Sequence, residues 1–162
     1  TIQAIDYDRH TVEIQSDQPL PDTLGSVARV SNPAYSRTTG YRIHGLRALG
    51  PKRFLLDLGD QSPILGHGRV HQLASDTSLK TDVPHEYARS VVGGADSRFF
   101  DGKTIRNDAG ATTRIKRLRF GAPMALTVQS TEGFAEGDRF TYLDLAPGDQ
   151  LHIPAAWQIA IP

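Results

Sequence analysis

The chain has 162 residues, enough to bury a core as one domain, or at most as two small domains that share an interface. Its 18 basic and 18 acidic residues cancel, so no global field favours nucleic acid or an anionic membrane as a partner, although the balance leaves a local patch open. Cysteine is absent, which excludes disulfides and thiolate metal sites, and no apolar run approaches the ~20 residues that span a bilayer.

Short extended segments separated by glycine and proline are predicted along the whole chain. The first two, 2–6 and 11–15, alternate apolar and polar residues around a turn at Asp8–Arg9–His10 and predict a hairpin. Further strands are expected at 26–31, 41–46, 54–58, 69–73, 115–120, 124–129, 137–145, 150–153 and 156–161. The 15 glycines and 10 prolines leave little room for helices. The predicted fold is all-β, an antiparallel β-sandwich or irregular barrel of hairpin and meander units, forming a single domain over residues 1–162.

Three segments share a plan of strand, short turn, strand, loop and a glycine that begins a third strand. Gly25, Gly66 and Gly137 occupy the corresponding places. We interpret the chain as three similar β-meanders packed together.

Candidate ligand-binding residues come mainly from polar, glycine-broken segments, above all from the stretch 83–107. Arginine's planar fork suits carboxylate, sulfate or phosphate groups, and a neighbouring aromatic ring can stack on a sugar face. The candidates are Tyr35, Arg37, Tyr87, Arg89, Arg98 and Trp157. For Trp157, which lies in an apolar strand, burial in the core is the competing interpretation.

No catalytic residue and no metal ligand is predicted. His67 and His71 would lie about 13 Å apart in a strand, too far for one ion, and no G-x-S-x-G motif is present. Aspartates in turns, such as Asp57 and Asp108, are expected mostly to accept hydrogen bonds from their own backbone. Binding of a structural calcium ion by such aspartates is the alternative. No other cofactor is expected.

The densest basic run extends from Arg114 to Arg119. In a regular strand, Arg114 and Lys116 would face one way while Arg117 and Arg119 face the other, so the run would make no single basic face. We interpret it as a solvated edge strand whose charges resist aggregation.

Three stretches carry a family resemblance: D-Q-P-L-P from Asp17 to Pro21, S-N-P-A-Y-S-R-T-T-G-Y-R-I from Ser31 to Ile43, and P-H-E-Y-A-R-S-V-V-G-G from Pro84 to Gly94. They resemble the C-terminal β-rich region of heparinase II/III-like polysaccharide lyases and related carbohydrate-active enzymes. That family's catalysis depends mainly on an α-helical toroid, which is missing here, so no catalytic residue is carried over. The resemblance implies an accessory domain, either carbohydrate-binding or structural.

The expected function is therefore that of a non-catalytic carbohydrate-binding module of a polysaccharide-degrading enzyme. Its partners would be a polysaccharide, acidic in kind, and the catalytic domain of the parent chain, in an extracellular or periplasmic location. Because Thr1 stands where an initiator methionine would, we expect the domain to belong to a longer protein. Two alternatives stay open: an autonomous lyase with Tyr87 or Tyr35 as acid and His85 as base, and a purely structural assembly domain.

Overall fold

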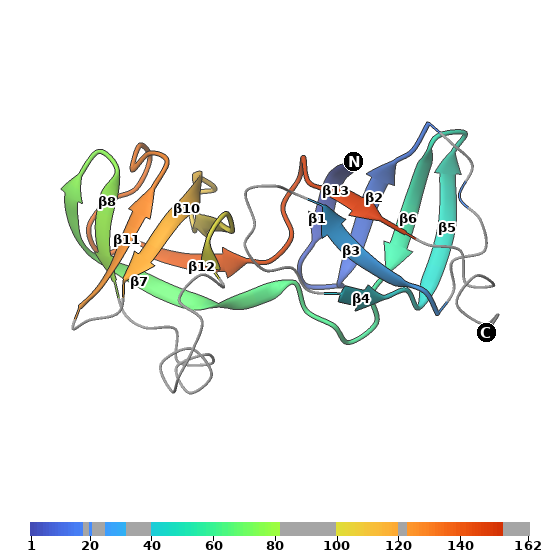
Figure 1. Ribbon diagram of the computed structural model, residues 1–162, viewed down its shortest axis with the longest axis horizontal. Coiled ribbons are helices and arrows are strands. Elements are labelled where there is room, and N and C mark those ends of the chain that lie inside the picture. The colour runs from blue at the N-terminus through green and yellow to red at the C-terminus, as the bar shows by residue number, and fades with distance from the viewer. Residues whose placement is uncertain (18–19, 21–24, 32–39, 82–99, 120–122, 154–162) are drawn as a thin grey trace. The chain divides into compact units, whose positions relative to one another are not determined.

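The computed structural model describes residues 1–17, 20, 25–31, 40–81, 100–119 and 123–153 (Figure 1). These residues form strands and no helix, and every strand pair is antiparallel, which confirms the all-β prediction. The strands are β1 (Ile2–Asp6), β2 (Thr11–Gln15), β3 (Val27–Ser31), β4 (Gly40–Arg42), β5 (Gly45–Gly50), β6 (Arg53–Asp57), β7 (Ile64–Ser75), β8 (Ser78–Thr81), β9 (Thr104–Asn107), β10 (Thr112–Arg119), β11 (Met124–Val128), β12 (Arg139–Leu143) and β13 (Gln150–His152).

The strands divide into two compact units, one encoded inside the sequence of the other. The first unit contains β1 to β6 and β13, and the second contains β7 to β12, which begin after Pro63 and end before Leu145. The sequence allowed for one domain or for two small ones, and the expectation of a single domain over 1–162 stays a prediction.

The first unit consists of a four-stranded sheet, β1-β2-β6-β5, and a three-stranded sheet, β13-β3-β4. At one side, the chain runs from the three-stranded sheet into the four-stranded sheet. There Ile43 N donates to Ser26 O and His44 N donates to Asp57 O, both at 2.8 Å. On the other side Ile2 N donates to Asp149 O at 2.8 Å. The two sheets are therefore joined by backbone hydrogen bonds at both sides of a core that contains Ile2, Val12, Ile14, Ala28, Val30, Tyr41, Ile43, Leu56 and Leu58.

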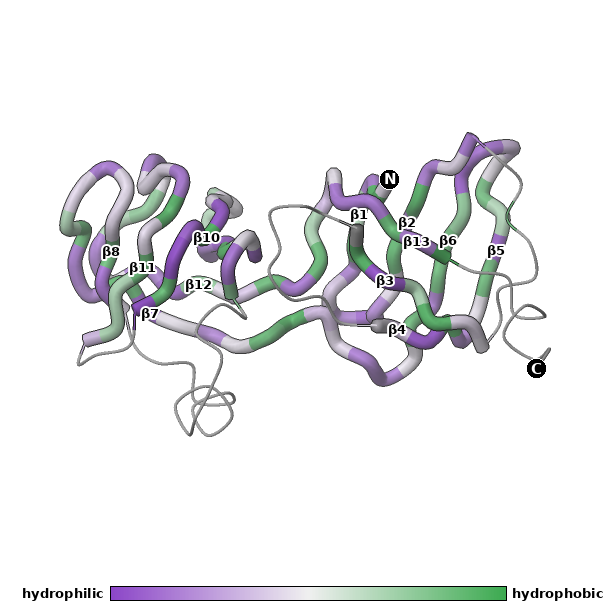
Figure 2. The backbone as a smooth tube through the Cα atoms, in the orientation of Figure 1, coloured by the Kyte–Doolittle hydropathy of each residue, from purple (hydrophilic) through white to green (hydrophobic). Residues whose placement is uncertain are grey.

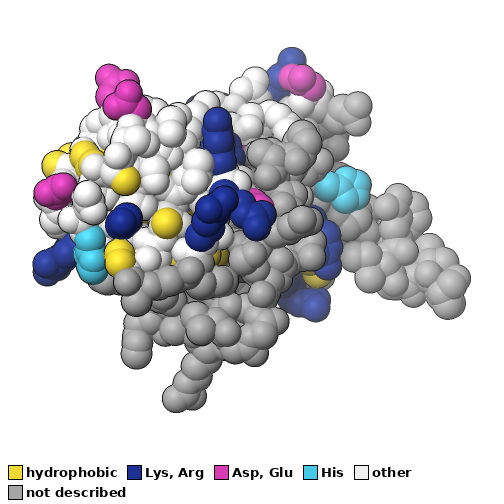
Figure 3. Space-filling view, turned by 60° about the vertical axis from the view of Figure 1, so that its left-hand side comes forward, with side chains coloured by type: hydrophobic (Ala, Val, Ile, Leu, Met, Phe, Trp, Pro, Cys, Tyr) yellow, Lys and Arg dark blue, Asp and Glu magenta, His cyan; other side chains and the backbone are white. Residues whose placement is uncertain are grey.

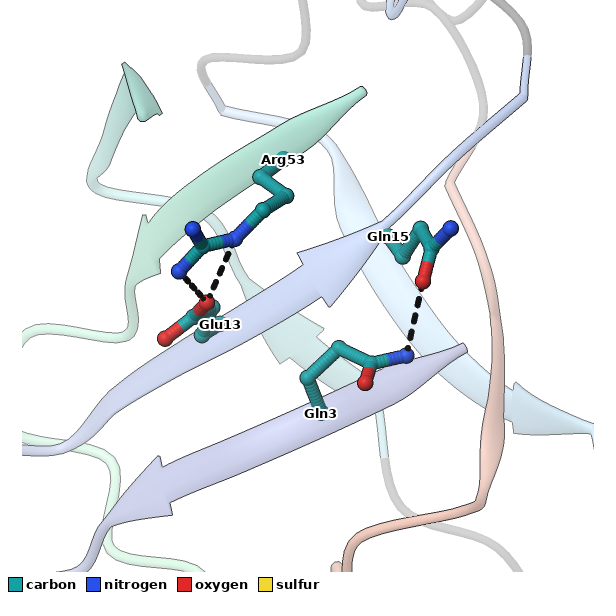
Figure 4. Close-up of polar contacts among 4 residues, drawn as sticks. All are labelled: Gln3, Glu13, Gln15 and Arg53. Carbon is teal, nitrogen blue, oxygen red and sulfur yellow. Dashed lines mark hydrogen bonds and ion pairs between the residues drawn. The ribbon is translucent and has the colours of Figure 1, made fainter. Parts of the chain in front are cut away.

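The outer surface of the four-stranded sheet is held by exposed polar pairs (Figure 4). Arg53 on β6 donates through Nε to Glu13 Oε1 on β2 at 2.9 Å, and Gln3 on β1 donates to Gln15 on β2 at 3.2 Å. Apolar residues alternate with polar ones along the strands of both units (Figure 2), as the period of two in a half-buried strand requires.

The second unit is a closed barrel with the strand order β10-β11-β8-β7-β12-β9, which confirms the barrel alternative of the predicted fold. Its core is centred on three aromatic rings: the Phe100 and Tyr142 centroids lie 5.1 Å apart, and those of Phe140 and Tyr142 lie 5.2 Å apart. Around them pack Leu65, Val70, Leu79, Ile105, Ile115, Leu118, Met124, Leu126, Val128 and Phe134.

Both units have the same order of neighbouring strands when β4 and β5 are counted as one bent strand. Around the first unit the order is β1-β2-β6-β5/β4-β3-β13, and around the second it is β7-β8-β11-β10-β9-β12. If the strands of each unit are numbered 1 to 6 along the chain, the spatial order of neighbouring strands in both units is 1-2-5-4-3-6. The chain thus contains two six-stranded units of one topology, with the second inserted before the last strand of the first.

The interpretation as three equivalent meanders is wrong. Gly66 lies inside β7, whereas Gly25 and Gly137 precede β3 and β12, which are the third and the sixth strands of their units. Gly25 and Gly137 resemble each other only locally: each has a positive φ and ends a turn before a strand.

Candidate functional site

The six ligand-binding residues expected from the sequence, Tyr35, Arg37, Tyr87, Arg89, Arg98 and Trp157, all lie outside the described residues. So do His85 and most of the stretch 83–107 that was expected to form a binding edge. Only the end of that stretch is described, and there β9 is a strand of the barrel wall. The six residues stay predictions.

The described part of the chain contains a different concentration of positive charge, on the strands of the second unit. These six strands carry eight Lys or Arg residues and no Asp or Glu. The acidic residues of this unit that the structure describes lie outside its strands. Because the inward positions of a barrel are filled by apolar side chains, charged strand residues lie on its outer surface. Lys and Arg side chains gather on the face that Figure 3 presents.

Two arginines face each other across the β7–β12 pair. Arg69 on β7 is the direct register partner of Arg139 on β12, and both are exposed. The adjoining backbone bond runs from Val70 N to Asp138 O at 2.9 Å. The Arg69–Arg139 pair therefore falls at a non-hydrogen-bonded position, where Cα atoms approach to about 4.5 Å and side chains are closest.

Like charges directly opposite one another on a sheet are destabilising unless an anion lies between them. Neither Arg69 nor Arg139 makes an ion pair or a side-chain hydrogen bond with any residue of the described segments. Their guanidinium groups are thus available to a ligand.

The arginine pair borders a shallow hollow of about 490 Å³ on the outer surface of the barrel. Thr141, the next outward residue on β12, pairs with His67 on β7 and with Arg106 on β9, and its Oγ1 lies 3.3 Å from His67 Nδ1. Asp108 supplies the one carboxylate. We call this site the arginine hollow; it is lined by His67, Gly68, Arg69, Asp108, Arg139, Phe140 and Thr141.

A second hollow of about 370 Å³ shares Asp108 and Thr141 with the first and adds Arg106 to the lining. The two hollows together are lined by parts of β7, β12 and β9 and by the turn that follows β9. A third arginine therefore lies along the same surface as the arginine pair.

The strands beneath the arginine hollow are closely packed because residue 68 is glycine. A Cβ atom at Gly68 would come within 2.6 Å of Phe140 Cζ and 3.0 Å of Thr81 Oγ1. The absence of a side chain lets the Phe140 ring pack directly against the β7 backbone. Arg69 and Arg139 thus extend from a pair of hydrogen-bonded strands, not from a loop.

The arginine hollow combines cationic groups with groups that form hydrogen bonds to hydroxyls. Paired guanidinium forks can bind carboxylate, sulfate or phosphate oxygens, and the Thr141 hydroxyl and the Asp108 carboxylate can bind hydroxyl groups. Among the described residues there is no group of three or more His, Asp or Glu side chains placed to hold a metal ion. His67 and His71 both lie exposed on β7, in the extended conformation predicted for them.

Asp57 forms a turn as predicted, since its Oδ1 accepts from Gly59 N at 2.8 Å. A structural calcium ion stays a prediction. Within the described segments, no helix has the length and hydrophobicity needed to cross a bilayer.

The first unit contains a hollow of about 360 Å³. It is lined by β-strand ends and the N-terminus, with Asp17 and His152 as its ionisable side chains. The Thr1 ammonium is already bound there to Gln15 O at 3.0 Å. It lacks the converging unpaired charges of the arginine hollow.

Sequence reasoning missed the arginine hollow because the balanced charge of the whole chain allowed a local patch without indicating where it lies. The available signal was local: from 64 to 81 and from 104 to 107, and again across 112–119 and 139–143, only Asp76 is acidic. That local signal does not show which of these strands are neighbours in the barrel.

Comparisons of the chain with protein-family models, with curated proteins and with solved structures found no match.

Proposed function

We propose that this chain is a non-catalytic carbohydrate-binding module of a polysaccharide-degrading enzyme and that its ligand is an acidic glycan. The observation that carries the proposal is the exposed Arg69–Arg139 pair, which lacks a carboxylate partner among the described residues and borders a hollow wide enough for a sugar ring.

The lining favours a glycan over other polyanions. A single carboxylate, that of Asp108, lies in the same hollow as the arginine pair. It repels a ligand whose charges are contiguous, such as a polyphosphate backbone, and it accepts hydrogen bonds from hydroxyl groups. An acidic glycan alternates charged and hydroxyl groups, so it satisfies both parts of the lining. The zero net charge of the chain is in keeping with this, since it provides no long-range attraction to nucleic acid.

The same proposal includes an extracellular or periplasmic location, because such a polymer is encountered outside the cytoplasm. It also includes a catalytic domain in the parent chain, because a binding module acts by holding an enzyme on the polymer. The alternatives, an autonomous lyase and a structural assembly domain, stay predictions: the tyrosines and histidine that a lyase would use lie outside the described residues.

Affinity electrophoresis at low salt against alginate, ulvan, heparin and pectin tests the proposal. We expect at least one of these polymers to retard the chain and the double variant Arg69→Gln/Arg139→Gln to bind it at least tenfold more weakly. The matched control is Arg29→Gln/Arg47→Gln, which removes the same charge from exposed strand positions of the first unit.

Equal weakening by both double variants would show a nonspecific charge effect. If none of the four polymers retards the wild-type chain, the proposed function is wrong.

A further inference from the structure

The basic run from Arg114 to Arg119 is arranged differently from the expected alternation. Ile115 pairs with Val128 but Arg117 pairs with Thr127, so β10 contains one extra residue, Lys116, in a β-bulge. Ile115 and Leu118 are consequently both buried in the core, at 1% exposure each, although an odd number of positions separates them. A regular strand would place them on opposite faces.

The bulge therefore places the cations of the run on the outside of the barrel. Lys116, Arg117 and Arg119 are exposed, and Arg114 is partly exposed. The expectation that the run makes no single basic face is wrong.

As a whole, β10 lies between β9 and β11 in a closed barrel. Its pairing with β9 covers only Thr112–Arg114, and along Arg117–Arg119 the partner among the described residues is β11 alone. The interpretation of these charges as protection of an open edge stays a prediction.

The strands beside β10 carry no acidic residue. Arg119 pairs with Ala125 on β11, which pairs in turn with Lys80 on β8. Arg117 likewise pairs with Thr127 on β11, a small uncharged residue. With strands about 4.8 Å apart, Arg119 and Lys80 begin about 10 Å from each other with only a methyl group between them. We call this surface the bulge face; it consists of Lys80, Lys116, Arg117 and Arg119.

None of the four cations of the bulge face makes an ion pair or a side-chain hydrogen bond within the described segments. The face carries no carboxylate on any of its three strands. Such a surface suits an extended chain whose anionic groups recur along its length.

The bulge face and the arginine hollow lie on opposite walls of one barrel. In the closed order β7-β8-β11-β10-β9-β12, the middle strand of the hollow, β12, is three places from the middle strand of the bulge face, β11. Outward side chains on opposite walls point in opposite directions. A ligand lying on one of these surfaces therefore leaves the other free.

We infer that the bulge face is a second site for acidic glycan, so that one copy of this chain bridges two polysaccharide strands. The inference rests on the proposed function, which supplies the ligand for the first site.

A sandwich assay tests it with heparin as the probe. Heparin beads are saturated with protein, washed at low salt and incubated with fluorescein-labelled heparin. We expect the wild-type protein to retain labelled heparin, and Lys80→Gln/Arg117→Gln/Arg119→Gln to bind the beads but to retain at least fivefold less label. Arg69→Gln/Arg139→Gln should behave in the same way, because it keeps only the bulge face. The control Arg29→Gln/Arg47→Gln should match the wild type.

The outcomes separate the two proposals. Failure of the wild-type protein to bind the beads counts against the proposed function itself, whereas bead binding without capture of label overturns only the second site. Capture by the triple variant at the wild-type level also overturns the second site, since bridging would then come from self-association of copies that each bind one strand. Complete loss of bead binding by the triple variant would mean that the bulge face is the sole site, which overturns bridging.

Discussion

The buried ion pair of the second unit gives the sharpest test of the structure. Lys103 Nζ donates to Asp144 Oδ1, and both side chains are 0% exposed. The pair lies beside the aromatic core, since Lys103 follows the Phe100 turn and Asp144 follows the end of β12. Replacing Asp144 by alanine removes this carboxylate from the buried Lys103 ammonium, and losing one partner of a buried pair costs about 3–5 kcal/mol of unfolding free energy.

The effect should be large in a urea titration followed by far-ultraviolet circular dichroism. With a denaturant slope of about 2 kcal/mol/M, a loss of about 3–5 kcal/mol lowers the midpoint of the affected transition by roughly 1.5–2.5 M. The double variant Lys103→Met/Asp144→Leu removes both charges and fills similar volume. We expect it to recover most of the loss or to exceed the wild-type stability, because a buried pair is generally no more stabilising than apolar side chains that pack well.

The exposed pair of the first unit provides the control. The side chains of Arg53 and Glu13 are 57% and 24% exposed, and Glu13→Gln should cost only about 0.2–1 kcal/mol (Figure 4). A midpoint for Asp144→Ala within about 0.5 M of the wild type, roughly 1 kcal/mol, would refute the reasoning that this carboxylate neutralises a fully buried ammonium.

Three further predictions follow from the packing and the charges. Gly68→Ala should destabilise the barrel by about 1–3 kcal/mol in the same titration, because its Cβ would approach Phe140 Cζ to 2.6 Å; Gly50→Ala, with no atom within 4 Å, should leave the midpoint nearly unchanged. A fragment of residues 64–144, which contains all six strands of the closed barrel and their core, should fold alone and unfold cooperatively in circular dichroism, and a fragment that lacks a cooperative transition would contradict the view that this core is self-sufficient. Raising sodium chloride from about 50 to 500 mM should weaken glycan retention of the wild type about tenfold or more, and salt-insensitive retention would mean that the arginines do not carry the binding.

The strand content and much of the strand positions were readable from the chain. The alternation in 2–6 and 11–15, with a turn between them, predicted β1 and β2 with their observed bounds, because side-chain periodicity and turn residues are local properties. β8 and β9 were missed. Each has only four residues, and three of the four in β9 are buried, so this strand shows no alternation.

The features on which the proposals depend are non-local. The arginine hollow requires β12 to lie beside β7, and the bulge face requires an extra residue at Lys116 that only the pairing with β11 reveals. Lys103 and Asp144 are 41 positions apart and meet because the barrel closes. A residue pattern specifies which side of a strand is apolar, whereas the neighbours of that strand depend on how all six apolar sides can be buried together in one closed ring. For this reason the all-β character could be predicted from local sequence, and the strand order, the bulge and the grouping of charges came from the folded chain.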